Sequence, residues 1–177
     1  MKKNITESLA KKIALVGMMT AMLSTGKAVL SFIPNVEIVS FMIVMFSVYF
    51  GRKTLLAVSG FVIIEGLLYG FNIWWVGYVY TWPLLCIISY CVRKRANLFT
   101  LTVISTLFGL FFGFMFSFVY IFAGSPNPGI GFALTWWTAG IPYDLIHGTG
   151  NAAVMLCLYK PVSKVLSIVT KNTQGGI

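Results

Sequence analysis

The segment from Gly140 to Asn151, which reads GIPYDLIHGTGN, carries the residues with the clearest chemical potential in this chain. It contains Asp144, which is one of four acidic residues, the single histidine His147, and Asn151. If Pro142 lies in the first helical turn, where its missing N–H costs nothing, positions 144, 147 and 151 follow at i, i+3 and i+7. The three side chains then share one helical face. Because the flanking sequence is apolar, they need partners or a wet cavity.

The chemistry that these residues favour is hydrogen bonding rather than catalysis. Asp144 and His147 offer only two ligands to a metal ion. The three cysteines lie in apolar runs without metal-binding spacing, as expected of small buried hydrophobes. No G-x-S-x-G, H-E-x-x-H or Walker A motif occurs in the sequence. We therefore expect no metal, no cofactor and no enzymatic activity.

The composition predicts an all-α integral membrane protein. The chain has 177 residues, of which 58% are hydrophobic and 10% are charged, and its mean hydropathy is +0.89. Soluble domains carry about 25% charged residues. The net charge of +9 comes from short clusters between apolar runs, which argues against nucleic acid as a partner. Because no long linker is visible, we expect a single domain (1–177) with six transmembrane helices at about 9–31, 35–50, 54–71, 74–92, 98–122 and 141–168. A short re-entrant or interfacial piece around 136–137 is an open alternative before the last helix.

The distribution of Lys and Arg predicts the orientation. With the N-terminus inside, twelve basic residues fall on the inner side and Lys27 alone on the outer side. Six spans then place both termini in the cytoplasm of a cell whose plasma membrane holds the protein. The inner residues are Lys2, Lys3, Lys11, Lys12, Arg52, Lys53, Arg93, Lys94, Arg95, Lys160, Lys164 and Lys171.

In this topology the remaining polar groups gather in the outer half, together with many aromatic residues. Charged side chains in lipid are costly, so they should face inward and meet each other or a ligand. They predict a pocket that opens to the outside, with aromatic walls and a few convergent polar groups. The alternative is a set of interhelical hydrogen bonds, such as Glu65 with His147. The predicted substrate-binding residues are Asn35, Glu37, Glu65, Tyr69, Asn72, Trp75, Trp136, Asp144, His147 and Asn151.

One face of the first predicted helix consists of small residues: Ala10, Ala14, Gly17 and Ala21. Small faces let a second helix approach closely in a membrane. This face serves either packing within the bundle or docking onto a separate membrane protein. Gly109 and Gly113 form a second pair of this kind.

Four segments carry a resemblance to a known family: 33–37 (IPNVE), 50–53 (FGRK), 65–71 (EGLLYGF) and 139–148 (AGIPYDLIHG). With the A-x-x-x-A pattern of the first helix, they resemble the S components of energy-coupling factor (ECF) vitamin transporters. Within that family they look like a bacterial subgroup linked to cobalamin or its precursors. The resemblance covers about residues 10–160.

The resemblance implies a protein that captures one vitamin in an outward-facing pocket and has no ATPase of its own. Its partners would be a transmembrane coupling subunit and two nucleotide-binding subunits, which hydrolyse ATP for uptake. The small-residue face would contact the coupling subunit. The expected ligand is cobalamin or a related corrinoid or benzimidazole compound, and the alternatives are pyridoxine, hydroxymethylpyrimidine or pantothenate. A stand-alone transporter, with Glu65, Asp144 and His147 as a proton relay, is the competing hypothesis.

Overall fold

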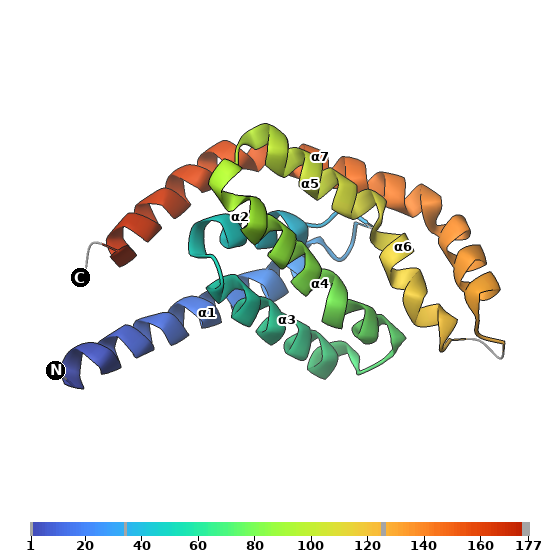
Figure 1. Cartoon of the computed structure of the whole chain (residues 1–177), viewed down its shortest axis with the longest axis horizontal. Helices are drawn as coiled ribbons and strands as arrows, with labels where there is room; N and C mark the ends of the chain where they lie inside the picture. The colour runs from blue at the N-terminus through green and yellow to red at the C-terminus, as the bar shows by residue number, and fades with distance from the viewer. Residues whose placement is uncertain (1, 34, 125–126, 175–177) are drawn as a thin grey trace.

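The computed structural model describes residues 2–33, 35–124 and 127–174, with side chains described at 9–33, 35–124 and 127–171. Residue 34 and the ends of the predicted domain at 1 and 175–177 lie outside the described residues, as do 125–126. In the described part all regular structure is helical (Figure 1). The elements are α1 (Lys2–Leu30), α2 (Val39–Phe50), α3 (Lys53–Tyr69), α4 (Ile73–Val92), η1 (Arg93–Arg95), α5 (Leu98–Leu110), α6 (Phe112–Ser117), η2 (Phe118–Ile121) and α7 (Ile130–Gln174).

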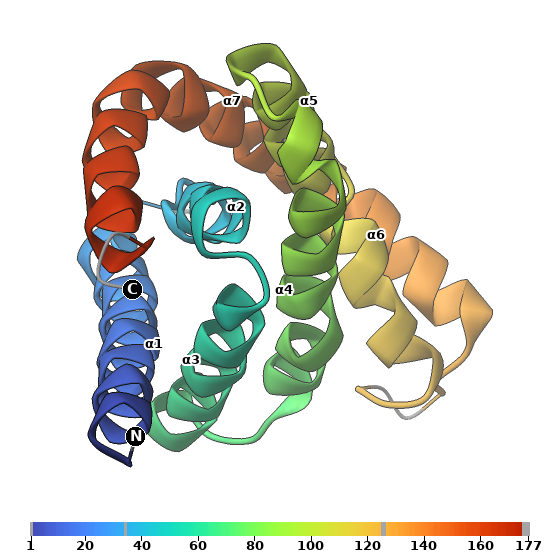
Figure 2. The same ribbon diagram turned by 60° about the vertical axis from the view of Figure 1, so that its left-hand side comes forward.

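Helix α2 forms the centre of the bundle. It contacts α1, α3, α4, α5 and α7, and Figure 2 shows it enclosed by them. Its sequence, VSFMIVMFSVYF, is apolar on every face, and eight of its 12 residues are buried. A helix that is hydrophobic all round is stable only when other helices cover it, which explains its central position.

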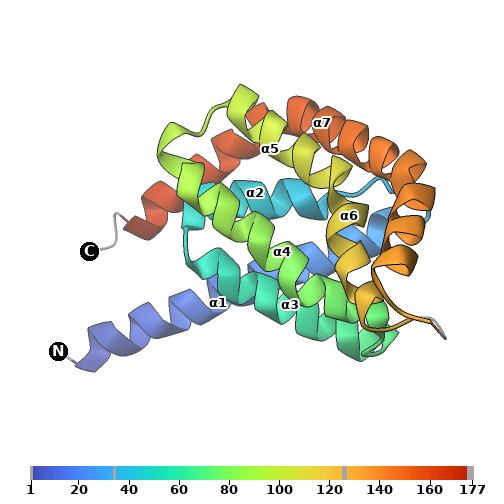
Figure 3. The ribbon, with the colours of Figure 1, turned by 45° about the vertical axis from the view of Figure 1, so that its right-hand side comes forward.

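The helices alternate in direction, which separates the connections into two groups. The links between α2 and α3 and between α4 and α5 lie on the same side as the start of α1 and the end of α7 (Figures 1 and 3). The link between α3 and α4 and the start of α7 lie on the opposite side (Figure 1). The first group of links carries Arg52 and the basic run Arg93–Arg95, whereas Lys27 lies in the last turn of α1. We call these two sides the basic end and the opposite end.

Helix α1 uses one face for the core and leaves the small-residue face uncovered. Met19 and Leu23 are fully buried, and α1 packs against α3, where Thr20 donates a hydrogen bond to the Ala57 carbonyl at 3.1 Å. Ala10, Ala14, Gly17 and Ala21 are all exposed. A Cβ added to Gly17 would find no atom within 4 Å. The described part of the chain therefore does not use this face for internal packing.

The glycine pair of α5 and α6 packs inside the bundle. A Cβ on Gly109 would lie 2.7 Å from the Cα and backbone nitrogen of Gly148 in α7. A Cβ on Gly113 would lie 2.6 Å from the Asp144 carboxylate. Small residues at these positions let α5 and α6 lie directly against α7.

Some predicted helix bounds agree with the structure and others do not. The first helix, predicted at 9–31, runs over Lys2–Leu30. The predicted helices 54–71 and 74–92 correspond to α3 and α4 within two residues. The helix predicted from 35 begins at Val39, because Asn35 has a left-handed φ of 57° and residues 36–38 are irregular. The segment predicted as one helix at 98–122 is α5 followed by α6 and η2, bent by 43°.

The last helix begins earlier than predicted. Helix α7 starts at Ile130 and not near 141, so Pro142 lies in its interior and residues 136–137 are helical rather than a separate piece. The turn before this proline packs against α6 and η2 through two aromatic contacts. Trp136 packs on Tyr120 with 4.5 Å between ring centroids, and Trp137 packs on Phe114 at 5.0 Å.

The long apolar helices are consistent with a membrane protein, with three to four candidate spans among the described residues. Three helices are long and apolar enough to cross a bilayer, namely Leu9–Leu30, Ile73–Arg95 and Ile130–Lys171, and the bent pair Leu98–Leu110 and Phe112–Ile121 makes a fourth if it counts as one span. Helix α2 has 12 residues. At about 1.5 Å per residue this is about 18 Å, compared with about 30 Å for the hydrocarbon core.

Replacing Gly109 with alanine should destabilise the protein, because the new methyl group meets the backbone of α7. We expect the free energy of unfolding to fall by about 1–3 kcal/mol. The matched control is Gly17→Ala on the uncovered face of α1, which should be neutral or stabilising by up to about 1 kcal/mol. Thermal unfolding of both variants in detergent checks this, and equal effects at the two positions would contradict the packing described.

Candidate functional site

A pocket of about 210 Å³ lies where the last turn of α1 meets α3 and α4. It is on the opposite end of the bundle from the basic links, since α3 finishes and α4 starts there (Figure 1). Four of its lining residues are aromatic and two are charged. The lining consists of Lys27, Glu65, Tyr69, Gly70, Asn72, Trp74, Trp75 and Tyr78.

The two charged residues of the pocket form an ion pair. Lys27 Nζ of α1 contacts Glu65 Oε2 of α3. The Glu65 side chain is only 4% exposed, whereas that of Lys27 is 28% exposed. A buried carboxylate needs a partner inside the protein, and Lys27 provides it for Glu65. The pair leaves the pocket without net charge.

Two tyrosine rings lie close to the lysine ammonium group. Lys27 Nζ lies 4.7 Å from the ring centroid of Tyr69 and 4.8 Å from that of Tyr78. These distances are within the range of a cation–π interaction. The ring faces of Tyr69, at the end of α3, and Tyr78, in α4, therefore border the charged pair.

The tryptophans of the pocket are fixed by contacts behind it. The Trp75 indole N–H donates to the Val62 carbonyl at 2.8 Å, and its ring packs edge-on against Phe71. Trp74 lies edge-on to Trp136, with 6.4 Å between centroids. Trp136 is thus a second layer behind the wall and does not itself line the pocket. The Trp75 ring, held by its hydrogen bond and by Phe71, offers an aromatic surface to a planar ligand.

Asn72 serves as the N-cap of α4. Its side-chain oxygen accepts a hydrogen bond from the Trp75 amide at 3.2 Å, and its Nδ2 donates to the Tyr69 carbonyl at 3.3 Å. An asparagine in this role satisfies an amide of the first helical turn. Asn72 therefore shapes the rim of the pocket while its amide is already engaged.

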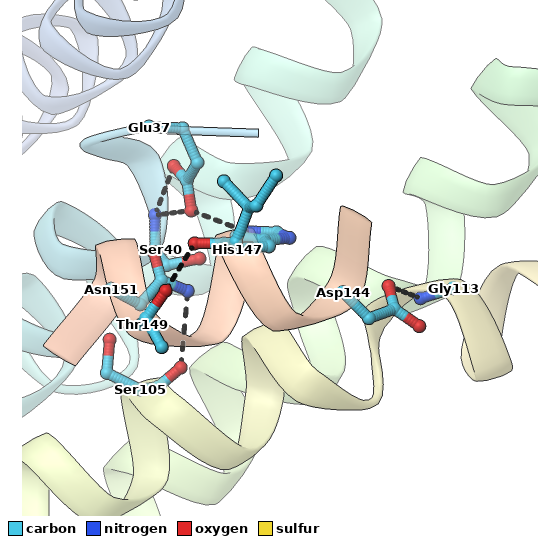
Figure 4. Close-up of polar contacts among 9 residues, drawn as sticks. Glu37, Ser40, Ser105, Gly113, Asp144, His147, Thr149 and Asn151 are labelled. Carbon is cyan, nitrogen blue, oxygen red and sulfur yellow. Dashed lines mark hydrogen bonds and ion pairs between the residues drawn. The ribbon is translucent and has the colours of Figure 1, made fainter. Parts of the chain in front are cut away.

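A second group of predicted residues lies between α7 and its neighbours (Figure 4). Asp144, His147 and Asn151 are buried there, and Glu37 is 17% exposed. The Glu37 carboxylate accepts from the Ser40 amide in the first turn of α2, with oxygen distances of 2.8 and 3.1 Å. Its Oε1 also lies 3.2 Å from His147 Nε2. A carboxylate is favourable at this end of a helix because the free amides there carry partial positive charge. Glu37 thus joins the start of α2 to α7.

Asp144 and Asn151 join α7 to the broken helix in front of it. Asp144 Oδ1 accepts from the Gly113 amide at 2.8 Å, and Asn151 Nδ2 donates to the Ser105 carbonyl at 3.2 Å (Figure 4). The Gly113 amide lies in the first turn of α6, where amides have no partner within the helix. The break between α5 and α6 therefore supplies the donor that Asp144 needs.

The predicted shared face of Asp144, His147 and Asn151 is confirmed, since all three side chains are at most 7% exposed and point toward neighbouring elements. The predicted contact of Glu65 with His147 is wrong. Glu65 pairs with Lys27, and His147 pairs with Glu37, because the link before α2 carries Glu37 onto α7. Asn35 lies in the same link, and its carbonyl is 3.7 Å from the position of a Cβ on Gly150.

The predicted substrate-binding residues therefore fall into two groups, those that line the pocket and those that lie elsewhere in the bundle. Glu65, Tyr69, Asn72 and Trp75 line the pocket, whereas the other six predicted residues do not. Lys27, Gly70, Trp74 and Tyr78 line it without having been in the set. Two sequence signals pointed to them: Lys27 is the one basic residue assigned to the outer side, and positions 74–82 are rich in Trp and Tyr.

Comparison of the chain with models of known protein families, with curated proteins and with solved structures gave no match.

A double-mutant cycle tests the contact between Glu37 and His147. We expect Glu37→Ala and His147→Ala each to lower the free energy of unfolding, with a coupling of about 0.5–3 kcal/mol between them. Chemical or thermal unfolding in detergent gives the four values. As a control, Glu37→Ala should combine additively with Asn97→Ala, because Asn97 caps α5 at the basic end by accepting from the Thr100 amide. Additivity in both cycles would remove the proposed link between α2 and α7.

Proposed function

We propose that the protein is the substrate-binding S component of an ECF-type vitamin importer in a bacterial plasma membrane. The observation that carries this proposal is the aromatic pocket around the Lys27–Glu65 pair. The pocket lies at the end of the bundle opposite the basic links. If the basic links face the cytoplasm, the pocket opens to the outside of the cell. The resemblance of segments 33–37, 50–53, 65–71 and 139–148 to this family points the same way.

The size and charge of the pocket favour a compact, neutral ligand with a planar ring. Pockets for drug-sized ligands have about 300–1,000 Å³, and this one has about 210 Å³. A ring of the size of pyridoxine, hydroxymethylpyrimidine or dimethylbenzimidazole suits it, whereas a corrinoid would require the pocket to open widely. Pantothenate, an anion, is less suited, since the positive charge of Lys27 is already balanced by Glu65.

We further propose that α1 to α4, the bent unit α5–α6–η2, and α7 each cross the membrane, with both termini in the cytoplasm. The alternating direction of these elements and the position of the basic links support six crossings (Figure 1). The shorter α2 is covered by other helices on its flanks, so it need not match the bilayer thickness by itself.

The uncovered face of α1 is the proposed contact with the transmembrane coupling subunit, which would in turn bind two nucleotide-binding subunits. Ala10, Ala14, Gly17 and Ala21 are exposed and have no packing role in the described chain. Close helix–helix contacts in membranes favour such faces.

The competing proposal of a proton-coupled transporter has less support. Its relay would need Glu65 to communicate with Asp144 and His147, but Glu65 pairs with Lys27 and Asp144 accepts from Gly113. Uptake that survives ATP depletion and collapses with an uncoupler would favour the relay over the ECF assignment.

A thermal-shift screen of the purified protein against vitamins tests the pocket. At a ligand concentration of about 100 Kd, the true ligand should raise the free energy of unfolding by about 2.7 kcal/mol without ATP. Tyr69→Ala should weaken binding about tenfold, because it removes one aromatic wall. The matched control is Tyr143→Ala, since Tyr143 is 57% exposed and outside the pocket, compared with 58% for Tyr69. Loss of binding in both variants, or in neither, would remove the pocket from the proposal.

Co-purification with an ECF module from the same genome tests the face of α1. Ala10→Trp with Ala14→Trp should reduce recovery of the coupling subunit while ligand binding is unchanged. Leu9→Trp with Ile13→Trp is the control, because Leu9 and Ile13 are also exposed, at 55% and 65%, but lie beside the small-residue face. Equal recovery with both double variants would contradict this docking site.

A further inference from the structure

A second pocket, of about 440 Å³, lies at the basic end of the bundle. It is built from the end of α2, the start of α3, and the junction of α4 with η1. Its lining combines apolar and aromatic residues of α2 with three cationic side chains, those of Arg52, Lys53 and Arg93. This pocket is separate from the site of the proposed function, which lies at the opposite end.

The two arginines converge on one aromatic ring. The guanidinium carbon of Arg93 lies 4.1 Å from the ring centroid of Tyr90, and that of Arg52 lies 5.9 Å from it. Of the described carboxylates, Glu37 and Glu65 pair with His147 and Lys27, and Asp144 accepts from Gly113. None of them pairs with Arg52, Lys53 or Arg93. Like charges held together repel, so the arrangement favours an anion between them.

The backbone adds to the same positive field. Helix α3 begins at Lys53 with no acidic residue in its first turn and no side-chain cap. The start of a helix carries partial positive charge. Here the Thr54 and Leu55 amides donate to the carbonyls of Gly51 and Arg52, so the contribution of the backbone is this partial charge. Gly51, with φ of 62°, lets the chain turn here, and a Cβ at this position would lie 2.8 Å from an Arg93 guanidinium nitrogen. The glycine thus allows Arg93 to lie directly against the start of α3.

We propose that this pocket binds a phosphate group. Guanidinium groups bind phosphate oxygens through paired hydrogen bonds, and the helix start favours the same charge. The pocket lies where the candidate span Ile73–Arg95 ends, which is the level of lipid headgroups if that span crosses the membrane. The ligand is therefore either the headgroup of an anionic lipid or a soluble phosphate compound, and both present the same chemistry.

The test uses the full chain purified in detergent, with the apparent unfolding temperature followed by tryptophan fluorescence. One arm titrates dioctanoyl phosphatidylglycerol against dioctanoyl phosphatidylcholine. The other arm titrates inorganic phosphate against chloride at equal ionic strength. The variants are Arg93→Gln and Arg52→Gln, with Arg95→Gln as the matched control. Arg95 is exposed on the same short helix as Arg93 but does not line the pocket.

We expect stabilisation of the wild type by phosphatidylglycerol, by inorganic phosphate, or by both. Arg93→Gln and Arg52→Gln should each weaken the apparent affinity at least about tenfold, as expected for one lost charge-assisted hydrogen bond. Arg95→Gln should change it less than about twofold, because surface charge alone contributes little. A response to phosphatidylglycerol alone assigns the site to lipid, and a response to inorganic phosphate alone assigns it to a soluble phosphate compound. A response to both shows that the pocket recognises the phosphate group that the two ligands share.

Two results would overturn the proposal. One is an equal loss of response in Arg95→Gln and in the pocket variants, which would mean non-specific attraction to net positive charge. The other is the absence of stabilisation by either probe. Because two independent pocket variants are used, misfolding of one leaves the other to decide, and the circular dichroism of each variant reports whether it is folded.

Discussion

A polar side chain among apolar helices has to find its partner inside the protein, because neither lipid nor an apolar core provides one. This constraint explains how the helices are joined. Glu37 with His147 connects α2 to α7, Asp144 connects α7 to α6, and Asn151 connects α7 to α5. Lys27 with Glu65 connects α1 to α3. The few ionisable side chains away from the basic end therefore also form the contacts that connect the helices.

The break after α5 shows how a local defect is used by the fold. An unbroken helix would leave the Gly113 amide bonded within its own helix, and Asp144 would lie buried without that donor. The break frees the amide, and the missing side chain of Gly113 leaves room for the carboxylate. The bend between α5 and α6, Gly113 and Asp144 therefore act together: the bend frees the Gly113 amide, and Asp144 accepts a hydrogen bond from it.

The all-helical class and the positions of most helices could be predicted from the sequence, because long apolar runs are separated by short clusters of charged residues. Helices α3 and α4 lie within two residues of their predicted bounds, because Arg52–Lys53 and Gly70 mark the two ends of α3 and the basic run Arg93–Arg95 follows α4. The start of α7 was missed because Pro142 looks like a helix beginning in sequence. In the structure the helix continues through Pro142, and the turn before it carries Trp136 and Trp137, which pack on η2 and α6.

The sequence by itself determined the membrane-type composition, the helical periodicity and the asymmetric distribution of Lys and Arg, since these depend on residue type and local spacing. It also placed Asp144, His147 and Asn151 on one face, because that depends only on the 3.6-residue repeat. Only the tertiary structure decided which charges meet. Pairing of Lys27 with Glu65, and of Glu37 with His147, joins residues 38 and 110 positions apart. Such pairs depend on how helices pack around α2, which no local pattern encodes.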